Sequence, residues 1–99
     1  MSKLAIVGLG LIGGSMALDL KKRLKYQIFG IDKNPEHIKS AIRLGIIDKE
    51  ANFSDLKDIE VVIVAVPVNH IAEVSQKVLD NISDGALVLD VGSVKKQYL

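Results

Sequence analysis

The feature that most constrains this chain is a glycine-rich turn between an apolar run and a helical pattern. Residues 4–7 read Leu-Ala-Ile-Val, as expected for a parallel strand buried on both faces. The next six residues read Gly-Leu-Gly-Leu-Ile-Gly, which matches the pattern G-x-G-x-x-G. That pattern is weakly specific alone, but after a buried strand and before a helix it predicts the first βαβ unit of a dinucleotide-binding fold.

Each glycine of this turn has a physical task in such a unit. Gly8 permits the tight turn, Gly10 lets a pyrophosphate approach the backbone, and Gly13 allows the helix to pack closely on the strand. The pyrophosphate would meet free N–H groups at the positive end of the helix, so Leu11 and Ile12 also belong to the predicted cofactor site. A strand-to-helix turn that binds nothing is the alternative interpretation.

An acidic residue follows the second predicted strand, residues 26–31. Asp32 lies 19 residues after Gly13, where a carboxylate can accept hydrogen bonds from both ribose hydroxyls of an adenosine. Its charge would repel a 2′-phosphate, so NAD is favoured over NADP, although Lys33 beside it softens that repulsion. A solvated acid next to a helix start is the alternative interpretation of Asp32.

Short apolar runs predict three more strands along the chain. They cover residues 51–53, 61–66 and 86–91, and the first of them is an edge strand. Since strands and helices alternate, the predicted fold class is α/β, a Rossmann-type doubly wound parallel sheet in the order 3-2-1-4-5, truncated after strand 5. Residues 1–99 then form one dinucleotide-binding domain, with the ligand crevice at the carboxyl ends of strands 1 and 4.

Helical periodicity separates these strands. The first predicted helix covers residues 11–24, Asn34-Pro35 start a second that ends at Gly45, and Asn69 is placed to cap a third. The apolar stripes are expected to face the sheet. They consist of Ile12, Met16, Leu20 and Leu24 in the first helix, Ile38, Ala41 and Ile42 in the second, and Ile71, Val74, Val78 and Ile82 in the third.

The strand at 61–66 ends at the predicted crevice. The backbone of Ala65, Val66 and Pro67 would therefore face the nicotinamide half of the cofactor. Pro67 stops the strand without leaving a backbone donor unpaired. A strand terminator without any cofactor contact is the alternative interpretation of these residues.

Composition argues against several other classes of protein. The 13 basic and 12 acidic residues nearly cancel, and aromatic residues make up 4% of the chain, so neither nucleic acid nor an anionic membrane is an expected partner. The sequence has no cysteine, which excludes thiolate catalysis and cysteine zinc sites, and we predict no metal site. No apolar run approaches the roughly 18 residues of a membrane span. We expect a cytoplasmic protein.

Four stretches of the chain together resemble the prephenate and arogenate dehydrogenases. They read Gly-Leu-Gly-Leu-Ile-Gly-Gly-Ser at 8–15, Leu-Gly-Ile-Ile-Asp at 44–48, Ala-Val-Pro-Val at 65–68 and Asp-Val-Gly-Ser-Val-Lys at 90–95, the last being the most specific. The resemblance covers essentially the whole chain. It implies the NAD-dependent oxidative decarboxylation of prephenate to 4-hydroxyphenylpyruvate, for tyrosine synthesis. It also implies that Ser93 helps to hold the reacting hydroxyl, and an N-cap of the following helix is a second role open to Ser93.

The resemblance further implies that this chain is the cofactor half of a larger enzyme. The family's catalytic histidine lies beyond the Gly-Ser-Val-Lys turn, and neither histidine of this chain matches it. We interpret His37 as a solvated residue away from the crevice and His70 as a surface helix residue. The family's helical domain, which binds the substrate carboxylates and forms a homodimer, is absent here. The fragment alone is therefore predicted to be inactive.

Two other functions are compatible with much of the sequence. Dehydrogenases of the 3-hydroxyisobutyrate or 6-phosphogluconate type carry a similar glycine turn, but the Gly-Gly-Ser continuation and the Gly-Ser-Val-Lys turn argue against them. A nucleotide-sensing regulatory module uses the same fold without chemistry, and Ser93 counts mildly against it. The choice between prephenate and arogenate, any feedback by tyrosine and the oligomeric state depend on features outside this sequence.

Overall fold

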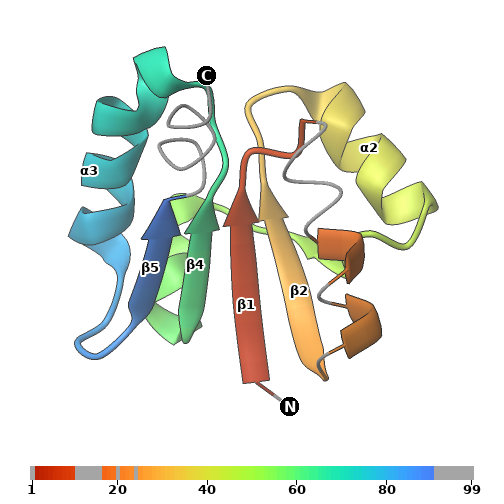
Figure 1. Ribbon diagram of the computed structural model, residues 1–99, viewed down its shortest axis with the longest axis horizontal. Helices are drawn as coiled ribbons and strands as arrows, with labels where there is room; N and C mark the ends of the chain where they lie inside the picture. The colour runs from red at the N-terminus through yellow and green to blue at the C-terminus, as the bar shows by residue number, and fades with distance from the viewer. Residues whose placement is uncertain (1, 11–16, 20, 24, 91–99) are drawn as a thin grey trace.

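A parallel sheet forms the centre of the molecule (Figure 1). The computed structural model describes residues 2–10, 17–19, 21–23 and 25–90. Within them the sheet has five strands in the order β3-β2-β1-β4-β5, and every neighbouring pair is parallel. The predicted fold class and strand order are therefore confirmed. The strands are β1 (Ser2–Val7), β2 (Tyr26–Ile31), β3 (Lys49–Glu50), β4 (Val61–Val64) and β5 (Leu87–Asp90).

The central strand β1 is buried on both faces of the sheet. Leu4 and Ile6 belong to one hydrophobic cluster, whereas Ala5 and Val7 belong to a second cluster on the opposite face. Side chains of a strand alternate between the two faces, so a strand covered on both sides needs apolar residues at every position. Burial on both faces therefore explains why an uninterrupted apolar run precedes the glycine turn.

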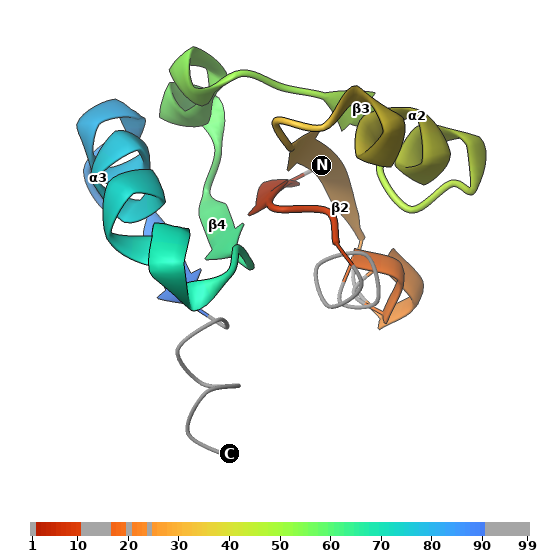
Figure 2. The same cartoon turned by 90° about the horizontal axis from the view of Figure 1, so that it is seen from above.

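Helices cover both faces of the sheet, which is the predicted doubly wound arrangement (Figure 2). On one face, α2 (Pro35–Arg43) packs through Ile38, and Ala17 joins the same cluster from a helical segment. On the other face, α3 (Ile71–Asn81) and the 3₁₀ helix η1 (Phe53–Asp58) bury Val78 and Leu56. A second short 3₁₀ turn, η2 (Val68–His70), precedes α3.

The helix α2 begins as predicted, and its C-cap lies one residue before the predicted Gly45. Asn34 is its N-cap, and the side-chain oxygen of Asn34 accepts the backbone N–H of Glu36 at 3.0 Å. Pro35 occupies the first helical position, where its missing N–H costs nothing. At the other end Leu44 is the C-cap, and Gly45 follows with a φ of +73°, a left-handed conformation that favours glycine.

Three predicted strands have different limits in the structure. The edge strand is Lys49–Glu50 and not 51–53, because Asn52 and Asp55 form a capping box that starts η1 at Phe53. Strand β4 ends at Val64, two residues earlier than predicted, although Ala65 still donates its N–H to the carbonyl of Val7 at 2.8 Å. Strand β5 is Leu87–Asp90, so it starts one residue later than predicted.

Two predictions about the helices are wrong. Asn69 lies inside η2, and α3 starts at Ile71 with His70 as an N-cap that makes no side-chain capping bond. Ile42 is 47% exposed, because the short helix α2 turns only Ile38 and Ala41 fully toward the sheet. The predicted stripe of the first helix falls outside the described residues, whereas 17–19 and 21–23 are helical.

The segment 44–48 joins the first helix, α2 and β2. Lys21 donates to the carbonyl of Gly45 at 3.1 Å and to Asp48 Oδ1 at 2.7 Å. Asp48 also pairs with Ile28 twice, because its Oδ2 accepts the N–H of Ile28 and its own N–H donates to the carbonyl of Ile28, both at 2.8 Å. Burial raises the pKa of Asp48, but the hydrogen bond from Ile28 and the Lys21 ammonium outweigh it and hold that pKa below the ordinary value.

Candidate functional site

The glycine turn brings the carboxyl ends of three strands together at Gly8. Its N–H donates to the carbonyl of Ile31, the last residue of β2, at 2.7 Å. Its φ is +100°, and a Cβ there would lie 2.8 Å from the carbonyl oxygen of Ala65, which follows β4. Only glycine satisfies both conditions, since the atoms in the way are backbone and cannot move aside. The positive φ and the close approach of Ala65 explain why the tight turn needs glycine at position 8.

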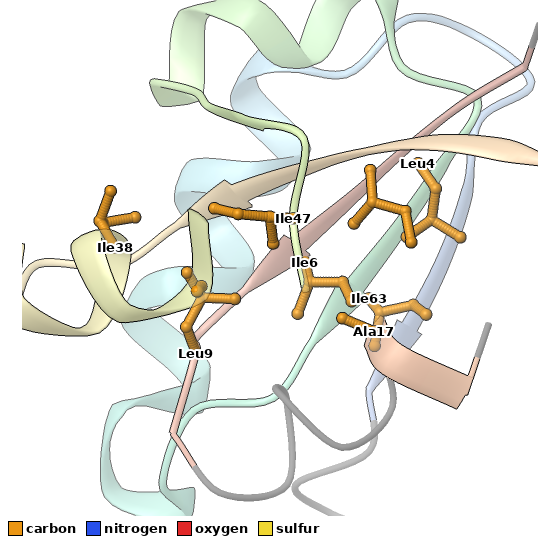
Figure 3. Close-up of a cluster of buried hydrophobic side chains, with 9 residues drawn as sticks. Leu4, Ile6, Leu9, Ala17, Ile38, Ile47 and Ile63 are labelled. Atoms are coloured by element: carbon orange, nitrogen blue, oxygen red, sulfur yellow. The ribbon is translucent and has the colours of Figure 1, made fainter. Parts of the chain in front are cut away.

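Leu9 connects the turn to β2 through both its main chain and its side chain. The N–H of Leu9 donates to Asp32 Oδ2 at 2.7 Å. Its side chain is 7% exposed and lies in the cluster that contains Ile38 and Ile47 (Figure 3). Gly30 makes room for it, because a Cβ on Gly30 would lie 2.8 Å from Leu9 Cδ1. Leu9 is thus held in place by contacts within the protein.

Gly10 is exposed. Apart from Gly10 itself and its two chain neighbours, no described atom lies within 4 Å of the position that a Cβ would take. Packing against the described residues therefore does not require a glycine at this position, whereas close approach of a ligand to the backbone would. Leu11, Ile12 and Gly13, the other predicted residues of the turn, lie outside the described residues.

The carboxylate of Asp32 lies beside this turn and receives three hydrogen bonds from described residues. Oδ2 accepts from the N–H of Leu9 at 2.7 Å and from His37 Nδ1 at 3.0 Å, and Oδ1 accepts from the N–H of Asn34 at 2.8 Å. The side chain is 9% exposed. Burial raises the pKa of Asp32, but the bonds from Asn34, Leu9 and His37 outweigh it, and the pKa lies below the ordinary value. Asp32 is therefore ionised at neutral pH and acts only as an acceptor.

The prediction that His37 lies away from the site is wrong. Its side chain is 45% exposed, as expected for a solvated residue, but its ring lies on Asp32. His37 is the third residue of α2, and side chains at this position commonly reach back past the N-cap. The five-residue spacing from Asp32 across the cap at Asn34 was the available signal in the sequence.

The residues after β4 form the other side of the turn. Val66 packs against the cluster on the α3 face, while Pro67 is exposed and its carbonyl accepts the N–H of His70 at 2.9 Å. Ala65 is the residue against which Gly8 packs. Lys33 is exposed and next to Asp32 in the chain. Ser93 lies outside the described residues.

The arrangement therefore combines an anionic acceptor with an open glycine backbone at the carboxyl edge of a parallel sheet. Such an edge is where open α/β sheets bind their ligands. Within the part of the chain that the structure describes, no group of three or more His, Cys, Asp or Glu side chains is placed to hold a metal ion. Across that same part, no helix is both long and apolar enough to cross a membrane.

Fold and site together define a Rossmann-type nucleotide-binding domain. Comparison with known families agrees, because residues 16–99 match the family described as "Prephenate dehydrogenase, nucleotide-binding domain". The chain belongs to this family. It is 38% identical over 98 residues to the prephenate dehydrogenase of Bacillus subtilis strain 168 and 35% identical over 103 residues to that of Lactococcus lactis subsp. cremoris strain MG1363. These alignments cover 95% and 100% of this chain but only 26% and 28% of the relatives, so the chain spans about a quarter of their length.

Solved structures show the same fold. The prephenate dehydrogenase of A. aeolicus, in complex with hydroxyphenyl propionate and NAD+, is 36% identical with a TM-score of 0.83, over 91% of this chain and 33% of that one. The arogenate dehydrogenase of Synechocystis has the same TM-score at 28% identity, over 89% of this chain and 32% of that one. A 3-hydroxyisobutyrate dehydrogenase of Mycobacterium tuberculosis is 23% identical with a TM-score of 0.79, over 91% and 31%, which shows a shared fold alone.

Proposed function

We propose that this chain is the NAD-binding part of a prephenate dehydrogenase, which converts prephenate to 4-hydroxyphenylpyruvate by oxidative decarboxylation. Family membership and the two prephenate dehydrogenase relatives support the proposal. The alternative of a 3-hydroxyisobutyrate-type dehydrogenase has only the shared fold in its favour. When bound, NAD supplies the acceptor for the hydride that leaves the substrate.

The observation that carries the proposal is the position of the Asp32 carboxylate beside the glycine turn, 2.7 Å from the N–H of Leu9. The residues present fit the cofactor. The ionised Asp32 would accept the adenosine ribose hydroxyls, and Gly10 would leave room for the pyrophosphate at its open backbone. The turn residues Leu11, Ile12 and Gly13 would complete the pyrophosphate site, and Ala65, Val66 and Pro67 would flank the nicotinamide half.

The charge at Asp32 also supports NAD over NADP. A 2′-phosphate would meet an ionised carboxylate of which only 9% is exposed, and like charges at such a site repel strongly. Lys33 is exposed beside it and weakens that repulsion without removing it.

The remaining parts of the proposal concern the complete enzyme. We propose that Ser93 holds the reacting hydroxyl of prephenate or arogenate, as a hydroxyl group at a strand end can. We also propose that the enzyme is a cytoplasmic homodimer, joined through a helical domain outside this chain, without nucleic acid or membrane as a partner. A protein containing this chain and that domain is expected to reduce NAD in the presence of prephenate, whereas residues 1–99 alone are not.

The test of cofactor binding is a calorimetric titration of the 99-residue chain with NAD. We expect Asp32→Asn to weaken NAD binding about tenfold to a hundredfold, because hydrogen bonds to a charged acceptor contribute about 1.5–3 kcal/mol. Asp84→Asn is the matched control, since Asp84 is exposed in the turn that precedes β5, at the opposite edge of the sheet. Equal affinities of the Asp32→Asn variant and the parent chain would contradict the proposed site.

A further inference from the structure

The acceptor capacity of Asp32 is nearly used up before any ligand binds. A carboxylate offers about four lone-pair positions, two on each oxygen. On Oδ2 both are taken, by the N–H of Leu9 and by His37 Nδ1, and on Oδ1 one is taken by the N–H of Asn34. Two ribose hydroxyls that bind one to each oxygen need two positions, and one of these must be on Oδ2. One of the two present donors to Oδ2 therefore has to leave.

The two donors to Oδ2 differ in how firmly they are held. Leu9 donates from its main chain, and its side chain is buried over Gly30 and against Ile47. Moving that N–H would require the buried side chain to move as well. His37 donates from a side chain that is 45% exposed on the surface of α2. Rotation about its side-chain bonds moves the imidazole into water and frees Oδ2 at a lower cost than moving Leu9 would require, so His37 is the donor that can leave.

We propose that His37 is an affinity-determining residue of the cofactor site, whose imidazole occupies the place of one ribose hydroxyl on Asp32 Oδ2 and is displaced when the cofactor binds. The inference rests on the proposed role of Asp32 as the ribose acceptor. In this inference the imidazole of His37 competes with the ribose for Oδ2 of Asp32. Because the hydrogen bond to His37 must break before the ribose binds, the ribose contributes less to the binding free energy. The part of the cofactor that competes is the adenosine, since the nicotinamide half does not reach Asp32 in this assignment.

The first experiment compares NAD affinities of variants at position 37. His37→Ala removes the competing donor and is expected to bind NAD about threefold to tenfold more tightly, the equivalent of one net hydrogen bond. His37→Asn retains an N–H close to the place of Nδ1 and is expected to bind NAD as the parent chain does. Lys39→Ala is the control on the exposed face of α2 and is expected to leave the affinity unchanged.

Partial ligands separate competition at the ribose from a general effect on folding. AMP carries the adenosine ribose, so its affinity should rise in His37→Ala by the same factor as that of NAD. Nicotinamide mononucleotide lacks the adenosine, so its affinity should not change. In NMR spectra of the parent chain, the ring signals of His37 are expected to shift on addition of NAD or AMP, and those of His70 serve as the internal reference.

Two results would overturn this inference and leave the proposed ribose site at Asp32 intact. One is weaker or unchanged NAD binding in His37→Ala while Asp32→Asn loses affinity, because His37 would then support Asp32 or be irrelevant to it. The other is an absence of any shift of the His37 ring signals at saturating NAD. If Asp32→Asn binds NAD as well as the parent chain does, the proposed ribose site itself fails, and this inference fails with it.

Discussion

The side chain of Leu9 lies directly against the backbone of Gly30, so the glycine turn and β2 are in contact where neither has room for another atom. A Cβ on Gly30 would lie 2.8 Å from Leu9 Cδ1 and 2.7 Å from Ile47 Cδ1. Both side chains are buried, at 7% and 2% exposure, and have little space to move into. Gly30 is therefore the point at which the core determines the position of Leu9, the residue that donates to Asp32.

The first prediction concerns Gly30→Ala. The added methyl group overpacks the cluster, and we expect a loss of about 1–3 kcal/mol in the free energy of unfolding. Displacement of Leu9 should also weaken NAD binding. Adding Ile47→Val removes the Cδ1 atom that lies nearest to the new methyl group, and the double variant is expected to regain part of both losses. Urea unfolding and NAD titration of the same samples measure the two effects.

A matched control separates positioning from general destabilisation. Ile28 lies on β2 in the same cluster but away from the glycine turn. The Ile28→Val variant should lose about 0.5–1.5 kcal/mol of stability without any change in NAD affinity. If Gly30→Ala lowers stability but binds NAD as tightly as Ile28→Val does, the core does not position Leu9 for binding.

The second prediction contrasts two glycines of one turn. Gly8→Ala places a methyl group 2.8 Å from a backbone carbonyl at a φ of +100°, so it should reduce the free energy of unfolding by more than about 1 kcal/mol. The added methyl group of Gly10→Ala meets no described atom within 4 Å beyond its own residue and chain neighbours, so the stability of this variant should stay within about 0.5 kcal/mol of the parent chain. Its NAD affinity should fall on the order of tenfold, because the methyl group occupies the path of the pyrophosphate.

Thermal unfolding with and without NAD checks both halves of this contrast. The parent chain should be stabilised by added NAD, whereas Gly10→Ala should require a higher NAD concentration for the same rise in Tm. An intact NAD response in Gly10→Ala would show that this glycine is not needed for ligand approach.

Local signals predicted the parts of the site that depend on neighbouring residues in the chain. The glycine turn, Asp32 at the end of β2 and the cap at Asn34 each follow from a short stretch of sequence, and the last two are found where expected. The contacts of Gly30 depend on how Leu9 and Ile47 pack from other parts of the chain, so no local pattern contains them. The contact of His37 with Asp32 spans only five residues across the cap at Asn34, and that spacing was a local signal that the prediction missed. The limits of β3 and the start of α3 were missed for another reason. The 3₁₀ helix η1 takes Phe53, which propensity assigns to the edge strand, and η2 takes Asn69, which propensity favours as the cap of α3.

The third prediction concerns the ion pair between Lys21 and Asp48, whose side chains are each about one-third exposed. Lys21→Met should cost less than about 1 kcal/mol, because partly exposed ion pairs contribute little. Asp48→Ala should cost about 1–3 kcal/mol, because it also leaves the N–H of Ile28 without its acceptor. Urea unfolding of both single variants and the double variant gives the coupling between the two side chains. Equal costs for the two single variants would mean that the bond to Ile28 contributes nothing.

The last prediction is the pH dependence of stability. The pKa values of Asp32 and Asp48 are lowered in the folded chain relative to an ordinary value of 3.8. As the pH falls, the unfolded chain therefore takes up protons at these two groups before the folded chain does, and proton uptake by the unfolded state lowers the free energy of unfolding. Their contribution is fully present well above pH 3.8 and is lost as the pH falls through that value and then through the lower pKa of each folded-state carboxyl.

Urea unfolding at a series of pH values from neutral to acidic measures this loss. The amides of Asp32→Asn and Asp48→Asn cannot take up a proton, so each variant should reduce the slope of the free energy of unfolding against pH in the acidic range. The two reductions should add, because the hydrogen bonds described for Asp32 and for Asp48 go to different residues. Asp84→Asn, an exposed acid in a turn, should leave the slope close to that of the parent chain. If all three variants show the same slope as the parent chain, neither Asp32 nor Asp48 is held by its hydrogen bonds in the way that their lowered pKa values require.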